Sequence, residues 1–238
     1  MVGGVTTPLD DTVHLLSHSA LGRGMPPDAV RDLAAQVTIL ERAQGDELCA
    51  EGAPATSLFL IARGIVKLVR ALESGREVIV ELLGRGDLFG ESALADGGSY
   101  DSRATCVHPS TVLAVPRAAA LALMAGHPQA VRNLLAVMND SVLRAHRRVE
   151  DLAVFGVRQR IARFLIRLAD WAGRPEDGRT VLPVALSRQD LASLVGTTTE
   201  TTIRVMSGLR RDGLVMPARR GLLLPDRDAL EAVARNDG

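Results

Sequence analysis

The spacing of hydrophobic residues changes at Pro128, and this change constrains the fold more than any other feature of the sequence. Before Pro128, apolar residues come in short runs broken by glycine, and after it they recur with the period of a helix. Short strands with tight turns favour an antiparallel sandwich or roll, because a parallel sheet needs helices between its strands. Expected turns lie at Gly64, Gly75, Gly84 and Gly86. A short helix over residues 27–36 precedes these runs, and residues 112–115 close the β-rich part.

Residues 131–152 carry an apolar stripe whose spacing alternates between four and three. Its members are Val131, Leu135, Met138, Val142, Ala145, Val149 and Leu152. Such alternation is typical of a coiled-coil seam and predicts a long helix that joins two copies of the chain about a two-fold axis. The alternative is a helix that packs only on its own domain.

Residues 187–211 have the pattern of two short helices joined at Gly196. Ser187 and Asp190 form a capping-box pattern, and the threonines at 197–199 are suited to cap the second helix. Residues expected to hold the two helices together are Leu191, Leu194, Val195, Ile203, Met206 and Leu209. This arrangement is a helix-turn-helix with Thr199, Glu200 and Arg204 facing outward. Residues 214–226 follow as a hairpin wing with its turn around 219–221.

The charge is unevenly distributed between the two parts of the chain. The whole sequence has 28 basic and 28 acidic residues, but residues 156–238 contain 14 arginines and 10 acidic residues. The C-terminal part is therefore net basic. A basic part suits a polyanionic partner such as DNA, since neutralised phosphates supply most of the non-specific affinity.

Several functional classes are not expected. Cys49 and Cys106 lie far apart in apolar runs, which indicates buried free thiols rather than a metal or iron–sulfur site. No triad order, metal-ligand spacing or nucleophile elbow points to an enzyme. The first residues lack a signal-peptide pattern and no apolar run is long enough to span a membrane, so we expect a cytoplasmic protein without membrane contact.

Three motifs occur in a recognisable order: Gly86-Asp87-Leu88-Phe89-Gly90-Glu91, then the helix after His127-Pro128, then Ser187-Arg188-Gln189-Asp190 with Gly196 and Glu200-Thr201-x-x-Arg204. Together they resemble the CRP/FNR family of bacterial transcription regulators over nearly the whole chain. The resemblance implies an α+β fold. Its parts would be an effector-sensing double-stranded β-helix (a jelly-roll-like β-roll) over 1–126, a dimerisation helix over 127–155, and a winged helix-turn-helix over 156–238.

In the family the roll binds a cyclic nucleotide, whose phosphate meets a helix N-terminus and whose ribose meets a glutamate. Carried over, the effector-binding residues are Phe89, Gly90, Glu91, Ser92, Ala93, Ser102, Arg103, Ala104, Ala145 and His146. Two alignments of the phosphate-binding arginine remain open: Arg103 is that residue, or Ser102 holds its position. Ala145 and His146 replace the adenine-binding Thr-Ser pair of the family, so the expected effector is a cyclic nucleotide or dinucleotide other than cAMP.

The resemblance also implies contacts to double-stranded DNA at a palindromic site, and to RNA polymerase if the protein is an activator. Expected DNA-binding residues are Arg188, Gln189, Thr198, Thr199, Glu200, Arg204, Arg219 and Arg220. Glu200 and Arg204 would read base edges, while the other arginines would grip phosphates. Two alternatives are a nucleotide-binding module that regulates a protein partner, and a ligand-independent regulator of the same fold.

Overall fold

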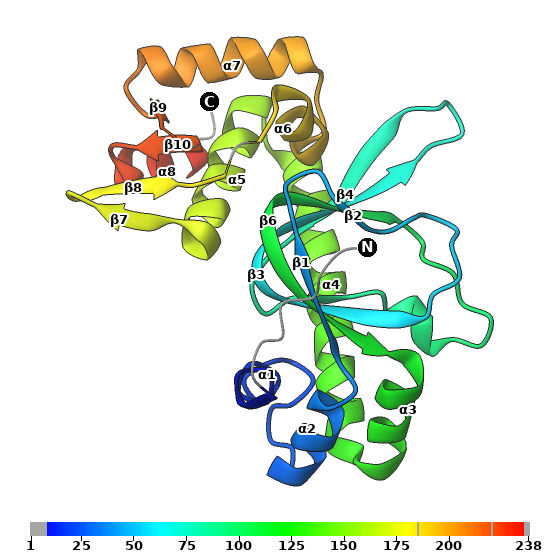
Figure 1. Ribbon diagram of the computed structural model, residues 1–238. Helices are drawn as coiled ribbons and strands as arrows, with labels where there is room; N and C mark the ends of the chain where they lie inside the picture. Colours follow the sequence, from blue (N-terminus) through cyan, green and yellow to red (C-terminus); the bar gives the residue numbers. More distant parts are fainter. Residues whose placement is uncertain (1–8, 185, 220, 236–238) are drawn as a thin grey trace. The chain divides into compact units, whose positions relative to one another are not determined.

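The computed structural model describes residues 9–184, 186–219 and 221–235. The chain divides into two compact units, the first ending at Leu143 and the second beginning at Arg144. The division lies within α4, Pro128–Val154, the long helix that the apolar stripe predicts. Figure 1 labels most of the helices and strands of both units.

The first unit is an antiparallel β-roll with helices before and after it. Its elements are α1 Leu9–Ser17, α2 Pro27–Ala34, β1 Thr38–Arg42, β2 Glu47–Cys49, β3 Ser57–Ala71, β4 Glu77–Leu83, β5 Leu88–Phe89, the 3-10 turn η1 Glu91–Leu94, β6 Arg103–Pro116, α3 Arg117–Gly126 and the first part of α4. The strands follow the order β1-β6-β3-β4, with β2 paired to β6 and β5 paired to β3. The roll architecture expected from the short apolar runs is therefore confirmed.

The long strands β3 and β6 form the centre of the roll, pairing from Ser57↔Pro116 to Val69↔Arg103. The turn expected at Gly64 is wrong, because Gly64 lies inside β3 at an irregularity of this register. Its φ of 100° is open to glycine, and a Cβ there would lie 2.1 Å from Oγ of Ser110. Gly64 thus bends a continuous strand where the backbone of β6 comes close.

Side chains from β3, β6 and the flanking helices fill one hydrophobic core. Leu58, Ile61 and Leu113 are almost completely buried, and so is Leu16 of α1. Burying a side chain of this size stabilises the fold by roughly 1.5–3 kcal/mol. The pattern of apolar runs does not predict α1 and α3, which are short helices of nine and ten residues.

The second unit contains the end of α4 and a helical domain with a small sheet. Its elements are α5 Val157–Ala172, β7 Arg174–Glu176, β8 Arg179–Leu182, α6 Arg188–Val195, α7 Thr199–Arg211, β9 Met216–Ala218, β10 Gly221–Leu224 and α8 Arg227–Arg235. The sheet is antiparallel, in the order β7-β8-β10-β9. The hairpin β9–β10 is the predicted wing.

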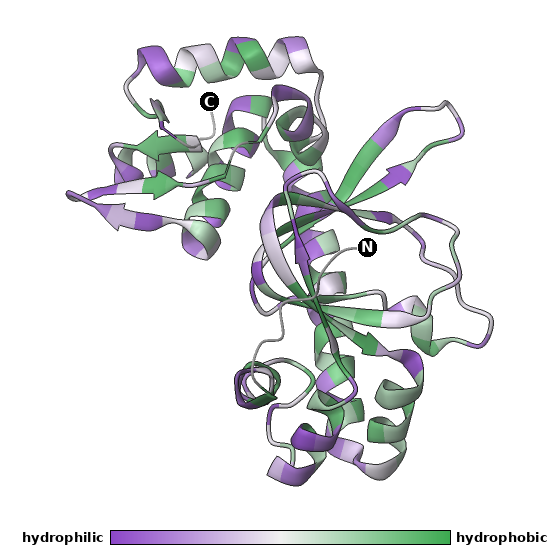
Figure 2. Cartoon of the chain, viewed as in Figure 1, coloured by the Kyte–Doolittle hydropathy of each residue, from purple (hydrophilic) through white to green (hydrophobic). Residues whose placement is uncertain are grey.

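Residues 174–182 form the hairpin β7–β8, although most of this segment reads as a charged loop in the sequence. Asp177 and Gly178 both have positive φ values, 48° and 73°, as a tight two-residue hairpin turn requires. Figure 2 shows β7 as mainly hydrophilic and β10 as mainly hydrophobic. The strand β7 is formed by pairing with β8 rather than by an apolar pattern of its own.

Cys49 and Cys106 are free thiols, as predicted; Cys106 is buried and Cys49 is half-buried. Among the described residues, no cluster of three or more His, Cys, Asp or Glu side chains is arranged to hold a metal ion. Within the same part of the chain, no helix is long and apolar enough to cross a membrane.

Candidate nucleic-acid interface and the pocket of the roll

The helix α6 begins at the capping box that the sequence predicts. Oγ of Ser187 accepts a hydrogen bond from the backbone N–H of Asp190 at 2.9 Å, and Oδ2 of Asp190 accepts one from the N–H of Ser187 at 3.3 Å. The helix ends at Gly196, whose φ of 67° favours glycine. A Cβ at Gly196 would lie 2.5 Å from the side chain of Leu152, so the turn between the two helices is tightly packed.

The helix α7 is capped by Thr198, whose Oγ1 accepts a hydrogen bond from the N–H of Thr201 at 3.2 Å. Its inner face is formed by Thr202, Met206 and Leu209, each at most 1% exposed. The hydroxyl of Thr202 donates to the carbonyl of Thr198 at 3.0 Å, which lets a polar side chain occupy this buried position.

The outer face of α7 carries Glu200, Ile203, Arg204 and Ser207, which the helical period places together. The prediction that Ile203 holds the two helices together is wrong, since it is 49% exposed while Thr202 is buried in its place. Within the part of the chain that the structure describes, neither Glu200 nor Arg204 makes an ion pair or side-chain hydrogen bond. The i, i+4 pair that would neutralise both charges is therefore not formed, and both side chains are available to a ligand.

Arg188 and Gln189 lie at the first turn of α6, with Arg188 half-buried and Gln189 exposed. Burial and the nearby charge of Arg210 lower the pKa of the Arg188 guanidinium. Two like charges held close together repel each other, and an anion between them relieves that repulsion. This position suits a phosphate group.

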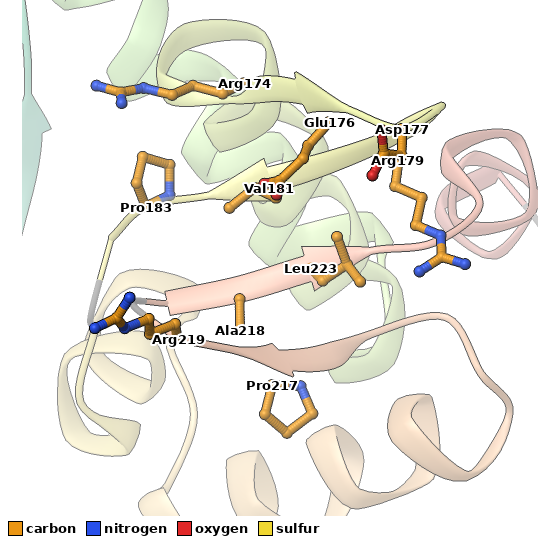
Figure 3. Close-up of a pocket in the computed structure, with 10 residues that line it drawn as sticks. All are labelled: Arg174, Glu176, Asp177, Arg179, Val181, Pro183, Pro217, Ala218, Arg219 and Leu223. Atoms are coloured by element: carbon orange, nitrogen blue, oxygen red, sulfur yellow. The ribbon is translucent and has the colours of Figure 1, made fainter.

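The sheet β7-β8-β10-β9 carries a hollow of about 600 Å³ on one face (Figure 3). Its described lining residues are Arg174, Glu176, Asp177, Arg179, Val181, Pro183, Pro217, Ala218, Arg219 and Leu223. The predicted phosphate ligand Arg219 is thus exposed at the turn of the wing. Arg220, the other wing arginine predicted, lies outside the described residues.

The last turns of α4 are attached to the helix-turn-helix within the second unit. Asp151 is buried and accepts hydrogen bonds from Arg163 at 2.8 Å and from Arg167 at 2.7 Å. Arg148 donates to the carbonyl of Ser193 at 3.0 Å, at the far end of α6. These contacts fix the orientation of the end of α4 relative to α6.

The roll contains a pocket of about 150 Å³ next to η1. Its described lining residues are Cys49, Leu68, Val80, Glu81, Leu88, Phe89, Gly90, Glu91, Tyr100, Asp101, Ser102 and Ser141. Gly90 has a φ of 85°, and a Cβ there would lie 3.1 Å from the carbonyl oxygen of Ser57. The hydroxyl of Tyr100 donates to that oxygen at 2.9 Å and closes one side of the pocket.

The predicted effector residues are only partly brought together. Phe89, Gly90, Glu91 and Ser102 line the pocket, whereas the following residues are not among its lining: Ser92, Ala93, Arg103, Ala104, Ala145 and His146. Ala93 and Ala104 are completely buried, and Ala145 and His146 are exposed on the part of α4 that belongs to the second unit.

A cyclic-nucleotide phosphate does not fit this pocket as it is built. The described lining residues contain three carboxyl side chains, those of Glu81, Glu91 and Asp101, and no lysine or arginine. Arg103 is not among these lining residues and donates to Oε1 of Glu77 at 2.7 Å, whereas Ser102 lines the pocket. The turn η1 spans four residues, and the N–H of Ala93 donates to the carbonyl oxygen of Gly90 at 2.9 Å.

Comparison with known proteins identifies both parts of the chain. Residues 40–127 match the cyclic nucleotide-binding domain and residues 159–233 match the Crp-like helix-turn-helix domain. The "Cyclic AMP receptor protein" of Thermus thermophilus is 32% identical over 200 residues, covering 83% of this chain and 88% of the relative.

The chain belongs to the CRP/FNR family of transcription regulators.

Other CRP/FNR proteins agree with this assignment. The "CRP-like cAMP-activated global transcriptional regulator" of Mycobacterium tuberculosis is 28% identical over 221 residues, covering 93% of this chain and 99% of the relative. The solved structure of FixK2 from Bradyrhizobium japonicum has a TM-score of 0.72 at 25% identity, covering 85% of this chain and 99% of that one. The chain is therefore a DNA-binding regulator that contains a cyclic nucleotide-binding domain.

Two features of this CRP/FNR chain are absent from the sequence-based predictions. Ile203 and Ser207 share the outer face with Glu200 and Arg204, and a count of the helical period from Glu200 would have found both. The acidic lining of the roll pocket was missed because Glu81 and Asp101 come from separate segments that only the folded roll brings together.

Proposed function

We propose that this protein reads a specific DNA sequence with α7, through Glu200 and Arg204. The observation that carries the proposal is that both side chains are exposed on one face of a well-capped helix and make no ion pair with any described residue. An arginine donates two hydrogen bonds to guanine, and a glutamate accepts from the amino group of cytosine. The pair therefore suits G·C positions in the major groove.

Phosphate contacts are proposed for Arg188, Gln189 and Arg219, with Thr198 and Thr199 at the N-terminus of α7. The lowered pKa of Arg188 beside Arg210 supports an anion at that point. Such contacts add affinity and set the orientation of the protein without reading sequence.

We propose that the regulator is a homodimer joined along α4. In the single chain, the large apolar residues of the stripe are between 39% and 65% exposed, from Val131 to Leu152. A second copy of the stripe would bury this surface, and a two-fold dimer would read a palindrome with half-sites roughly 34 Å apart. The three functional regions proposed are the roll over 1–126, the dimer helix over 127–155 and the DNA-binding domain over 156–238.

Selection from a random duplex library tests the DNA proposal directly. We expect a palindromic consensus with a G·C pair in each half-site, and recruitment of RNA polymerase at that site if the protein is an activator. A consensus without two-fold symmetry would contradict the proposal. Because the target is genomic DNA, we propose that the protein acts in the cytoplasm.

Control of DNA binding by an effector in the roll is the form of regulation that the family suggests, and coupling requires that the effector bind two dimer states with different affinity. A regulator independent of cyclic nucleotides is the second candidate, and the pocket favours it. The volume of about 150 Å³ is below the roughly 300 Å³ of small ligand sites, and three carboxyl groups line it. Calorimetry with cAMP, cGMP and cyclic di-GMP decides between them: binding that is lost in Glu91→Ala supports effector control, and no binding supports the second candidate.

A further inference from the structure

The outer face of α7 presents one large apolar side chain between its two charged residues. Ile203 is 49% exposed, follows Glu200 by three positions and directly precedes Arg204. Residues three and four apart are neighbours on a helix surface, so Ile203 shares the face of the other two. A ligand that contacts both Glu200 and Arg204 therefore lies close to Ile203.

Ile203 is not among the buried residues of α7. The contacts between the two helices are made by the buried residues Thr202, Met206 and Leu209, which lie on the opposite face of α7. Isoleucine is also a weaker helix former than alanine because its side chain is branched at Cβ. An apolar side chain that is half-exposed there has surface left to bury against a partner.

The neighbouring residue Ser207 does not compete for the same contact. Its hydroxyl donates to the carbonyl of Ile203 at 2.8 Å, so it is engaged with its own helix. Ile203 is therefore the side chain of this face that offers apolar surface rather than hydrogen bonds.

In the major groove, the apolar group of a base pair is the C5-methyl of thymine, which apolar side chains contact. We propose that Ile203 contacts a thymine methyl group beside the G·C position of each half-site, and so specifies a T·A pair that neither Glu200 nor Arg204 reads. This inference rests on the proposed function of α7, and it adds a third specificity-determining residue to it.

Replacing thymine by deoxyuridine tests the contact, since it removes the methyl group and leaves base pairing intact. On the duplex selected by the full-length protein, we expect each thymine-to-deoxyuridine change at the proposed position to weaken wild-type binding about fourfold, the scale of burying one methyl group. Changing both half-sites should weaken it roughly fifteenfold. The Ile203→Ala variant should bind the thymine duplex and the deoxyuridine duplex with equal affinity. The Ile203→Val variant should keep most of the wild-type difference in affinity between them.

Thermal melting of each variant shows whether the fold is intact. Because Ile203 is half-exposed, we expect no large loss of stability in either variant. Equal binding of the two duplexes by the wild type would overturn the inference. An unchanged deoxyuridine effect in Ile203→Ala, or a consensus without thymine beside the G·C pair, would do the same. Failure of the wild type to select any duplex is a different result, because it overturns the proposed function itself before any variant is compared.

Discussion

Asp151 accepts a hydrogen bond from Nε of Arg163 at 2.8 Å, and only 5% of Asp151 is exposed. The second carboxyl oxygen accepts from Arg167 at 2.7 Å, and the guanidinium of Arg163 also lies over the ring of Phe155 at 4.1 Å. The last turn of α4 is thereby held against α5 by a carboxylate that has two arginine partners. This arrangement makes the end of α4 part of the second unit.

Removing the charge of Asp151 is expected to destabilise the second unit. Asp151→Asn should lower the free energy of unfolding by about 2 kcal/mol, less than for a fully buried pair because both arginines remain partly exposed. The matched control is Glu150→Gln, an exposed position one residue earlier, where we expect a change within about 0.5 kcal/mol. Urea unfolding measures both, and equal stability of the two variants would contradict the role of Asp151.

A charge in the apolar stripe is expected to split the dimer. Val142 is 51% exposed in the single chain, and Val142→Asp would place an unpaired carboxylate in the proposed interface. Light scattering should show a dimer for the wild type and a monomer for Val142→Asp. Ala136→Asp adds the same charge at an exposed position outside the stripe and should remain dimeric. A wild-type monomer at micromolar concentration is incompatible with the seam.

Arg204 and Arg219 are expected to contribute to DNA binding in different ways. Arg204→Ala should lose about 1–3 kcal/mol on the selected duplex and flatten the preference at one base pair, because it removes a base contact. Arg219→Ala should weaken binding to all duplexes alike and reduce the salt dependence, because a phosphate contact carries no sequence information. Repeating the selection and the salt titration on each variant measures both effects. Unchanged base preference in Arg204→Ala would show that α7 does not read DNA as argued.

The Cys49 thiol is expected to react slowly in the folded protein. Burial raises its pKa to about 11 from an ordinary value of 9.0, so below pH 9 the reactive thiolate is about a hundredfold rarer than in the unfolded chain. Alkylation at pH 8, mapped to each cysteine by mass spectrometry, should be correspondingly slower in the folded protein than in urea. The raised pKa also means that the thiol contributes stability below pH 9 which is lost as the pH rises through about 11. Equal alkylation rates in both states would show that Cys49 is more open than its burial indicates.

Patterns that repeat along one element were predictable from the sequence. The long helix α4, the capping box at Ser187 and the αL turn at Gly196 each depend on residues close together in the chain, where helical period and backbone conformation act locally. The same holds for the placement of Glu200 and Arg204 on the outer face of α7. Ile203 is the exception: its hydrophobicity favours a buried position, whereas the helical period places it on the exposed face with Glu200 and Arg204.

Features that depend on pairing between distant segments were decided only by the tertiary structure. The strand β7 has no apolar pattern and exists because β8 offers it hydrogen-bonding partners, and Gly64 sits in a strand rather than a turn because β6 pairs across it. The direction of Arg103 was open in the sequence because a one-residue shift of a strand turns a side chain to the other face. In the folded roll Arg103 is paired with Glu77, while Asp101 and Glu81 join Glu91 around the pocket because the fold brings three separate segments together.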